Sequence, residues 1–330
     1  MTRVVGRPTP RVEGELKVTG KALYSADLNL PGTLWGKVLR SPISYGRIKN
    51  IDTSKAWQVP GVKAVITGKD VTGLRIGRCI YDTPVLADGV VRFIGEKVAA
   101  VAAETEEAAE QAVDLIEVEY DELEPLLDPV QAAKPDAPVL HPDLLSYKGL
   151  PVPVERLSNV FAYLNWGKGD VVAGFKQADL VVENTFTTQV THQSYLEPHA
   201  CVVKADSSDG AEVWSCSKTP FAVRTQLSNC IGVAKEKLVF HPTHIGGDFG
   251  GKGGFMDVPV CYFLSLKSGR PVKMVMDYSE ELVAGNPRHP AIIKVKTGVK
   301  KNGLIVAHHM DFLFDSGAYG SMKPAGYLIG

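Results

Sequence analysis

The chain has 330 residues, of which 45% are hydrophobic and 22% are charged, and this balance is typical of a folded protein rather than a disordered one. Its formal net charge of −1 provides no overall field to attract nucleic acid or an anionic membrane. No apolar run approaches the roughly 20 residues of a membrane helix, and the first residues lack a hydrophobic signal core. We therefore expect a cytoplasmic location and two domains.

The segment from residue 14 to 130 alternates short strand patterns with turns. Strands are predicted at Leu34–Leu39, Val62–Ile66 and Val98–Ala102. A helix follows from Thr105 to Ile116, with Ala108, Ala112 and Leu115 spaced to share one face, and an alternating strand comes next at Glu117–Tyr120. The order strand, helix, strand predicts a crossover packed on a sheet.

A proline-rich stretch separates this segment from the remainder. Prolines recur between Pro125 and Pro153 with little periodicity, and proline disfavours helix interiors and central strands. An extended connector over the surface is therefore expected. The predicted organisation is a first domain at 1–130, a linker at 131–154 and a second domain at 155–330.

The second domain is predicted to hold more strand than helix, which makes the whole chain α+β. Helices are expected at Pro220–Ile231 and at Val258–Lys267, the latter ended by Gly269 and Pro271. Alternating apolar runs predict strands at Leu180–Glu183, Cys201–Lys204, Glu212–Ser215, Val239–His241 and Ile292–Lys296.

The strongest local motif is GGDFGGKGG at residues 246–254, between a predicted strand and a predicted helix. Glycines permit positive φ and close approach, so such a loop can present N–H groups to an oxyanion or to a large planar cofactor. The spacing matches neither the P-loop pattern Gly-x-x-x-x-Gly-Lys-Ser/Thr nor the dinucleotide fingerprint Gly-x-Gly-x-x-Gly. A flexible turn is the alternative, but Phe249 among the glycines needs burial or a partner.

Histidines and cysteines form no recognisable metal or nucleophile pattern. His241 and His244 are three apart, but Pro242 lies between them and no third ligand is near, so structural histidines are the better interpretation. Five cysteines are widely spread without a Cys-x-x-Cys pair, which argues against a disulfide framework or an iron–sulfur cluster on this chain. Cys216 and Cys230 are only weak candidates for a catalytic nucleophile, because the sequence does not give their distance to a histidine. Most cysteines are interpreted as small buried hydrophobes.

Several motifs together resemble the molybdenum-binding subunit of the xanthine dehydrogenase and aldehyde oxidase family. Residues 17–42, 46–70 and 92–128 are similar to the α/β hammerhead domain that opens this subunit. The later motifs follow in the family's order: QSYLEPHACVV at 193–203, VWSCSKTPFAVRTQLSNCIGV at 213–233, GGDFGGK at 246–252, GRPVKMVMDYSEEL at 269–282 and DSGAYG at 315–320. The resemblance implies a hammerhead domain followed by the first half of the molybdopterin-binding domain.

The resemblance also implies a cofactor and a reaction. Members hold molybdenum through the dithiolene of a pterin, often as molybdopterin cytosine dinucleotide in bacteria, and insert a water-derived oxygen beside a ring nitrogen or a carbonyl. Electrons leave through [2Fe–2S] clusters and FAD, expected here on partner subunits. Phe249 would lie near the molybdenum oxo ligand without binding the metal, and the cofactor would contact Gly246, Gly247, Asp248, Phe249, Gly250 and Gly251.

Two matched positions depart from the family pattern. Lys218 stands where members usually have a glutamine that donates a hydrogen bond to a molybdenum oxygen. We expect Lys218 to bind the cofactor near the oxo ligand, either carrying a full charge or neutralised by burial. Gly253, a substrate-side position, replaces a glutamate that holds the purine in xanthine-oxidising members. Purine is therefore a poor substrate guess, and an N-heteroaromatic compound or an aldehyde is expected.

No catalytic residue is assigned to this chain, because the family's catalytic glutamate lies in the later half of the molybdenum-binding region. We expect the chain alone to be inactive and to need a second molybdopterin-binding chain, as in nicotinate dehydrogenase, with iron–sulfur and FAD subunits, a small-molecule substrate, and no nucleic acid or membrane. Alternatives are a non-catalytic or cofactor-handling relative with a degenerate site, and a reductase of the 4-hydroxybenzoyl-CoA type. A truncated chain is also considered, since residues 327–330 resemble the middle of a strand.

Overall fold

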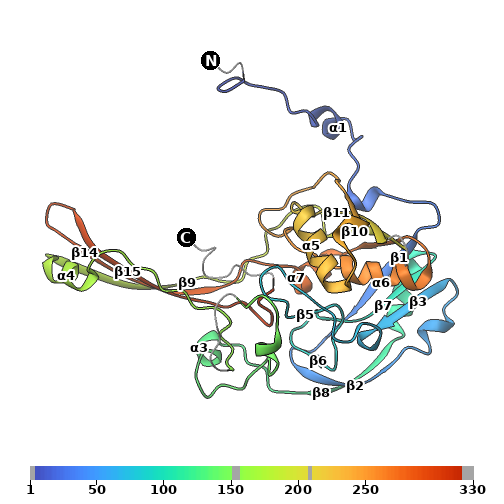
Figure 1. Cartoon of the computed structure of the whole chain (residues 1–330), viewed down its shortest axis with the longest axis horizontal. Helices are drawn as coiled ribbons and strands as arrows, with labels where there is room; N and C mark the ends of the chain where they lie inside the picture. The colour runs from blue at the N-terminus through green and yellow to red at the C-terminus, as the bar shows by residue number, and fades with distance from the viewer. Residues whose placement is uncertain (1–3, 151–156, 207–209, 322–330) are drawn as a thin grey trace.

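A computed structural model describes residues 4–150, 157–206 and 210–321. The fold is α+β, as expected, and its centre is a seven-stranded mixed sheet in the order β12-β11-β10-β13-β1-β7-β3 (Figure 1). Its strands are β1 (Leu34–Arg40), β3 (Val62–Thr67), β7 (Lys97–Ala103), β10 (Ala200–Asp206), β11 (Gly210–Ser215), β12 (Leu238–His241) and β13 (Val272–Val275).

Strands from both predicted domains share this sheet. β1 pairs in parallel with β13, with Leu34 opposite Val272, and antiparallel with β7. The first-domain strands β1, β7 and β3 and the second-domain strands β10 to β13 therefore form one sheet. The division at 1–130, 131–154 and 155–330 stays a prediction, and residues 151–156, around its second boundary, lie outside the described residues.

Helices cover both faces of the large sheet. Alternate residues of a strand point to opposite faces, so Ala64 and Ile66 of β3 pack with α6 (Val258–Ser268), whereas Val65 packs with α2 (Glu106–Asp114). α5 (Pro220–Ile231) adds Val223 and Leu227 to the first core. The large core thus includes residues of β12 and of α6, the two elements that flank the connecting segment between them.

The predicted helix at 105–116 is confirmed as α2, with Thr105 capping its first turn by accepting from the N–H of Ala108 at 3.2 Å. The predicted crossover is wrong. β7 belongs to the large sheet, but β8 (Glu117–Glu122) pairs antiparallel with β2 (Gly46–Asp52) in a separate sheet that also holds β6 (Val90–Val91). Sheet membership depends on partners far away in sequence, which local pattern does not reveal.

The two helices predicted in the second half are confirmed. α5 begins at Pro220 and α6 begins at Val258 with proline in its first turn, and both end at a glycine in the left-handed conformation, Gly232 and Gly269, with φ of 73° and 66°. These terminal signals are local, so the sequence could place them. A shorter helix, α7 (Tyr278–Ala284), follows β13.

The proline-rich linker is more structured than expected. The proline-rich stretch that begins at Pro125 contains α3 (Pro129–Ala132) and a 3₁₀ turn at Leu144–Ser146, and the side chains of Leu144 and Tyr147 are buried against Ile80. The expectation of an extended surface connector is therefore corrected, because two apolar side chains anchor the linker to the body. The small hairpin β4 (Arg75–Ile76) and β5 (Thr83–Pro84) lies beside it, and α1 (Gly14–Val18) precedes the first sheet.

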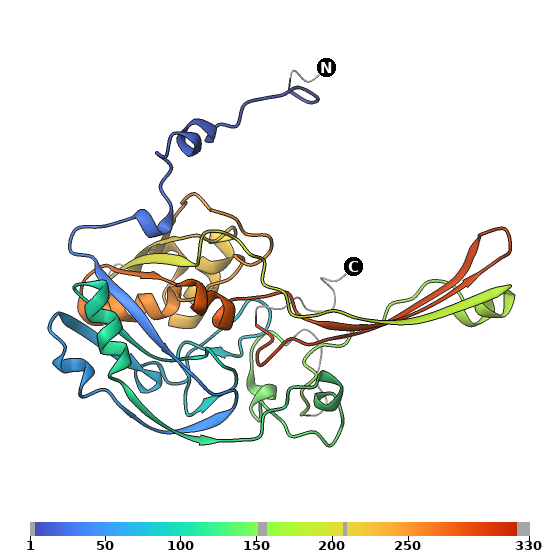
Figure 2. The ribbon, with the colours of Figure 1, turned by 180° about the vertical axis from the view of Figure 1, so that it is seen from behind.

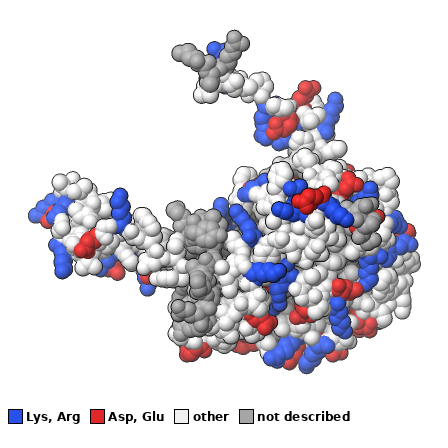
Figure 3. Space-filling model, in the orientation of Figure 1, with Lys and Arg blue, Asp and Glu red and all other residues white. Residues whose placement is uncertain are grey.

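A three-stranded antiparallel sheet extends away from the body (Figures 1 and 2). It consists of β9 (Leu180–Thr187), β14 (Ala291–Val299) and β15 (Ile305–Phe314), with α4 (Val171–Gln177) near its tip, and we call these strands the arm. Positive and negative side chains are interspersed over the face shown in Figure 3. Among the described residues, no helix is long and apolar enough to cross a bilayer.

Candidate functional site

The glycine-rich loop, defined as residues 246–252, connects β12 to α6 at the edge of the large core. Gly247 and Gly250 have φ of 102° and 100°, which favours glycine, and Phe249 has a φ of 44°, which is uncommon for a bulky side chain. The Phe249 side chain is 68% exposed. From the sequence we expected Phe249 either to be buried or to contact a partner. The described part of the chain does not bury it.

A buried ion pair closes the loop. Nζ of Lys252, whose side chain is fully buried, lies 2.6 Å from Oε2 of Glu197, and the N–H of Gly246 donates to the same oxygen at 2.7 Å. One carboxylate oxygen thus holds the first and last residues of the loop. Because a buried charge needs a partner, this pair fixes where the loop begins and ends.

Asp248 organises the tip of the loop from inside. Its Oδ1 accepts from the N–H of Lys252 at 2.7 Å, and its Oδ2 accepts from the N–H of Gly250 at 3.0 Å and from Nζ of Lys218 at 2.7 Å. Partial burial raises the pKa of Asp248, but the hydrogen bonds from Lys218 and the two backbone groups outweigh it and lower the pKa overall. Asp248 is therefore ionised and committed to the loop.

Tyr195 forms the floor under the glycines. Its side chain is fully buried, and a side chain at position 251 would place its Cβ 2.5 Å from Cε1 of Tyr195, while one at 247 would come within 3.0 Å of its Cβ. Nζ of Lys252 also lies 4.7 Å from the centre of the Tyr195 ring, a favourable cation–π distance. Glycine is required at 251 by this close contact.

Glu281 of α7 holds Tyr195 in place. The Tyr195 hydroxyl donates to Oε2 of Glu281 at 2.7 Å, and Nδ1 of His199 lies 2.8 Å from Oε1 of Glu281. Burial raises the pKa of Glu281, but the hydrogen bond and charge of His199, with the Tyr195 hydroxyl and the backbone N–H of His199, lower it to about 2. This buried carboxylate links α7 to the floor of the loop.

The stretch at 215–221 lies beside the loop, so the two motifs are brought together. The N–H of Lys218 donates to the carbonyl of Lys252 at 3.0 Å, and the Thr219 hydroxyl donates to the carbonyl of Gly253 at 3.0 Å. The Lys218 side chain is 43% exposed and pairs with Asp248. Gly253 is buried, with a Cβ position 3.5 Å from Cε of Lys218.

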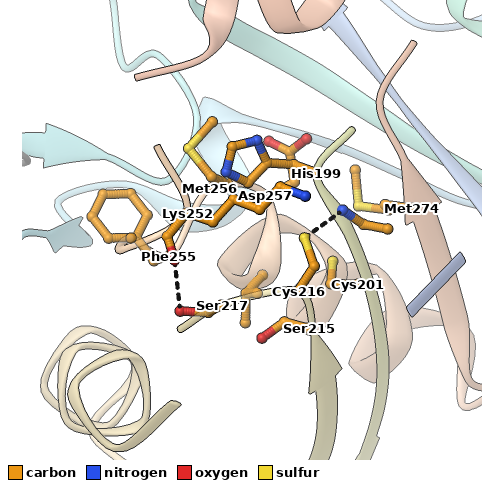
Figure 4. A pocket seen from close by; sticks show the side chains of 13 residues that line it. His199, Cys201, Ser215, Cys216, Ser217, Lys252, Phe255, Met256, Asp257 and Met274 are labelled. Atoms are coloured by element: carbon orange, nitrogen blue, oxygen red, sulfur yellow. Dashed lines mark hydrogen bonds between the residues drawn. The ribbon is translucent and has the colours of Figure 1, made fainter. Parts of the chain in front are cut away.

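A small cavity lies on the inner side of the loop, between β10, β11 and the start of α6 (Figure 4). Ser217, Lys252 and Asp257 are among its lining residues, and its volume of about 20 Å³ accommodates one water molecule at most. This cavity is therefore too small to hold a pterin cofactor. Burial raises the pKa of Cys216, also on the cavity wall, to about 12, which makes it a poor nucleophile.

Several polar groups in and beside the loop have no partner within the described residues. Within the described residues, the backbone N–H groups of Gly247, Asp248 and Phe249 have no hydrogen-bond acceptor. Oε1 of Gln193 and Oε1 of Glu197 are buried next to the loop and likewise lack a partner in this part of the chain. The three N–H groups of the loop fit a bound group that carries hydrogen-bond acceptors.

The remaining sequence candidates lie elsewhere. His241 stacks on Trp214 and pairs with Glu212 at 3.0 Å, while His244 forms a bridge with Tyr24, so these two histidines lie in separate structural contacts. Four of the five cysteines are buried, as interpreted from the sequence. Sequence reasoning missed the roles of Tyr195, Glu197 and Glu281, although each belongs to a quoted family motif, because their partners lie far away in the chain.

Two family models match the chain. The "Molybdopterin cofactor-binding domain" matches residues 154–328, and the "Aldehyde oxidase and xanthine dehydrogenase, a/b hammerhead domain" matches residues 19–124. The glycine-rich loop, its floor and the arm all fall within the first of these two matches.

Relatives agree with the family models. The chain is 38% identical to a probable xanthine dehydrogenase subunit of Bacillus subtilis, covering 98% of this chain and 42% of that protein. It is 33% identical to the nicotinate dehydrogenase large molybdopterin subunit of Eubacterium barkeri, covering 98% and 73%. CO dehydrogenase from Oligotropha carboxidovorans superposes with a TM-score of 0.84 at 32% identity, covering 98% and 42%. The chain thus spans less than half the length of two of these three proteins, and it belongs to the xanthine dehydrogenase and aldehyde oxidase family of molybdopterin-dependent oxidoreductases.

Proposed function

We propose that this chain supplies one face of the catalytic site of a molybdenum hydroxylase that acts on an N-heteroaromatic compound or an aldehyde. The observation that carries the proposal is the glycine-rich loop, where three consecutive N–H groups lack acceptors within the described residues and Phe249 is exposed. When bound, the molybdenum–pterin group supplies the two-electron redox chemistry.

The chain's own residues bind and orient that group. The backbone of residues 246–251 and the ammonium of Lys218 would hold it, and we propose its cytosine dinucleotide form. Glu197 and Asp248 keep the loop in one conformation, and Tyr195 supports it from beneath. A preorganised loop contributes to catalysis because no reorganisation is needed when charge develops.

The proton acceptor of the reaction is proposed to come from a second molybdopterin-binding segment. Asp248 uses both oxygens to hold backbone N–H groups and Lys218, and Glu197 is paired with the fully buried Lys252. Accepting a proton would cost either carboxylate its role in fixing the loop. We propose partner subunits carrying [2Fe–2S] clusters and FAD to remove the electrons.

The substrate class is proposed from position 253. A glycine at 253 offers no side chain to hold a purine. Of the relatives, one is named for nicotinate, an N-heteroaromatic acid, and others are named for xanthine and for carbon monoxide. The alternative is a non-catalytic relative, which the Lys218–Asp248 ion pair favours because it already engages the lysine within this chain.

Metal analysis of the protein purified from its native host with its partners tests the proposal. We expect about one molybdenum per copy of this chain, together with a pterin detected by fluorescence after oxidation. A complex lacking both would refute the hydroxylase function. Lys218→Gln in the same complex distinguishes the alternative, because a rise in hydroxylase activity would show that the lysine marks a degenerate site.

A further inference from the structure

Three buried polar atoms without a hydrogen-bond partner among the described residues belong to side chains that line the small cavity beside the glycine-rich loop. They are Nε2 of His199, Oγ of Ser215 and Oδ1 of Asp257, and Figure 4 labels all three side chains at the cavity. Buried polar atoms are normally satisfied by the protein or by ordered water. Three unpartnered atoms from separate segments at one cavity therefore indicate a bound ligand.

The strand register turns two of these side chains to the same side of the large sheet. Cross-strand partners share a face, and Cys201 of β10 lies opposite both Ser215 of β11 and Met274 of β13. His199 precedes Cys201 by two residues and so shares that face. Its carbonyl accepts from the N–H of Met276 at 2.9 Å, which continues the strand pairing. Cys201 and Met274 pack in one core cluster with α6, so His199 and Ser215 face the side on which α6 lies.

The hydrogen bonds that His199 and Asp257 already make leave one atom of each side chain for a further partner. Nδ1 of His199 lies 2.8 Å from Oε1 of Glu281, so Nε2, on the far side of the ring, is directed away from that carboxylate. Asp257 directly precedes α6, and its Oδ2 accepts from Nη2 of Arg40 at 3.1 Å. Its Oδ1 lies 3.8 Å from Nζ of Lys97, beyond hydrogen-bond distance.

The size and the chemistry of the cavity fit one water molecule. Its volume of about 20 Å³ exceeds the roughly 10–15 Å³ that a single water needs, but it is too small for a phosphate or an organic group. The carboxylate oxygen of Asp257 accepts, the Ser215 hydroxyl donates or accepts, and Nε2 of His199 does either according to its tautomer. Water has two donors and two acceptors, so it matches this set in each state of the histidine.

The charges beside the cavity favour a neutral ligand. Asp257 is already paired with Arg40, and Lys252, another lining residue, is paired with Glu197 at 2.6 Å. A cation would therefore find no uncompensated carboxylate at the cavity, and an anion would find no free ammonium. Burying an unpaired charge is costly, whereas a water molecule adds none.

We propose that this cavity binds one ordered water molecule, held by His199, Ser215 and Asp257. The water connects two parts of the molecule, because His199 is bonded to Glu281, which holds the floor of the loop, and Asp257 is bonded to Arg40 of β1. It therefore helps to fix the floor of the loop relative to the hammerhead strands. The inference goes beyond the proposed function and does not depend on it, because the site consists of residues of this chain alone.

A crystal structure of the full chain, with the partners that copurify, tests the proposal directly. We expect one density peak in the cavity, within hydrogen-bond distance of at least two of the three atoms. Ser215→Ala removes only one of the three partners, so the peak should remain. Ser215→Thr adds a methyl group of about the size of the water and should displace it. An empty cavity in the unmodified protein, or a peak that changes with the cation of the buffer, overturns the proposal.

Solution measurements distinguish a displaced water from a dry cavity. Water-deuteron relaxation dispersion counts long-lived internal waters, and we expect one fewer in Ser215→Thr than in the unmodified protein. The midpoint of thermal unfolding should fall by roughly 2–4 °C, because buried polar atoms lose their partner. Ser54→Thr is the control, since it adds the same methyl group to an exposed serine and should leave both measurements nearly unchanged.

Two results of these measurements would contradict a bound water. Filling a dry cavity with a methyl group would raise the midpoint of unfolding of Ser215→Thr instead of lowering it. A lower midpoint with an unchanged water count would mean that the methyl group only overpacks the site. Neither readout involves molybdenum, so a protein that lacks the metal would refute the hydroxylase function and leave this proposal standing.

Discussion

Replacing Glu197 by glutamine tests whether its ion pair with Lys252 fixes the glycine-rich loop. The substitution keeps the size of the side chain but removes its charge, so the fully buried ammonium of Lys252, 2.6 Å away, loses its partner. Removing one partner of a buried pair costs about 3–5 kcal/mol, which is a large part of the roughly 5–15 kcal/mol that stabilises a typical domain. We expect Glu197→Gln to unfold at much lower urea concentration.

Equilibrium unfolding in urea, followed by tryptophan fluorescence, measures this loss. Glu183→Gln is the control, because Glu183 and its partner Lys296 are both exposed and such pairs contribute about 0–1 kcal/mol. A double variant, Glu197→Gln with Lys252→Met, should recover part of the stability because no buried charge remains. If Glu197→Gln loses no more stability than Glu183→Gln, the pair does not hold the loop.

Three further predictions concern the same region and the buried carboxylates. Gly251→Ala should lose about 1–3 kcal/mol, because its Cβ would lie 2.5 Å from the fully buried Tyr195 ring, whereas Gly253→Ala should change little, and molybdenum content should fall only in the first. Burial raises the pKa of Glu96 to about 7 despite hydrogen bonds from Tyr319 and the Arg92 N–H, so its contribution to stability is complete below pH 4.5 and disappears as the pH rises through 7. Melting curves from pH 5 to 8 should show this loss of stability, worth up to about 3 kcal/mol, and Glu96→Gln should abolish it. Glu281 has the opposite sign, with a pKa of about 2, so its contribution is present above pH 4.5 and is lost as the pH falls towards 2; Glu281→Gln should flatten the acid unfolding curve, and an unchanged curve would contradict this role.

Local signals explain which parts of the fold could be predicted. The helix at Pro220–Ile231 was placed to the residue because proline and glycine mark its ends. The strands at 34–39, 62–66 and 98–102 were also found, each within a residue or two of β1, β3 and β7. The partner of each strand could not be predicted. β8 pairs with β2, about 70 residues earlier, and no local pattern specifies that choice.

Some contacts of the candidate site could likewise be predicted from the sequence, and others could not. The resemblance placed Lys218 beside the glycine-rich loop, and the backbone hydrogen bond from Lys218 to Lys252 shows that the two motifs do meet. The contact of Tyr195 with Glu281 joins residues 86 positions apart, and only the packing of α7 against the 193–199 segment creates it. Supporting residues of this kind carry no signature of their own in a single sequence.

The shared seven-stranded sheet has a consequence for how this protein can be divided. The parallel pairing of β1 with β13 joins the hammerhead strands to those that precede and follow the loop. Cutting the chain between the two family regions would expose the hydrogen-bonding edge of β1 on one fragment and that of β13 on the other. Neither fragment is therefore a self-sufficient unit for expression, and a hammerhead exchanged between relatives must bring an edge strand that fits β13.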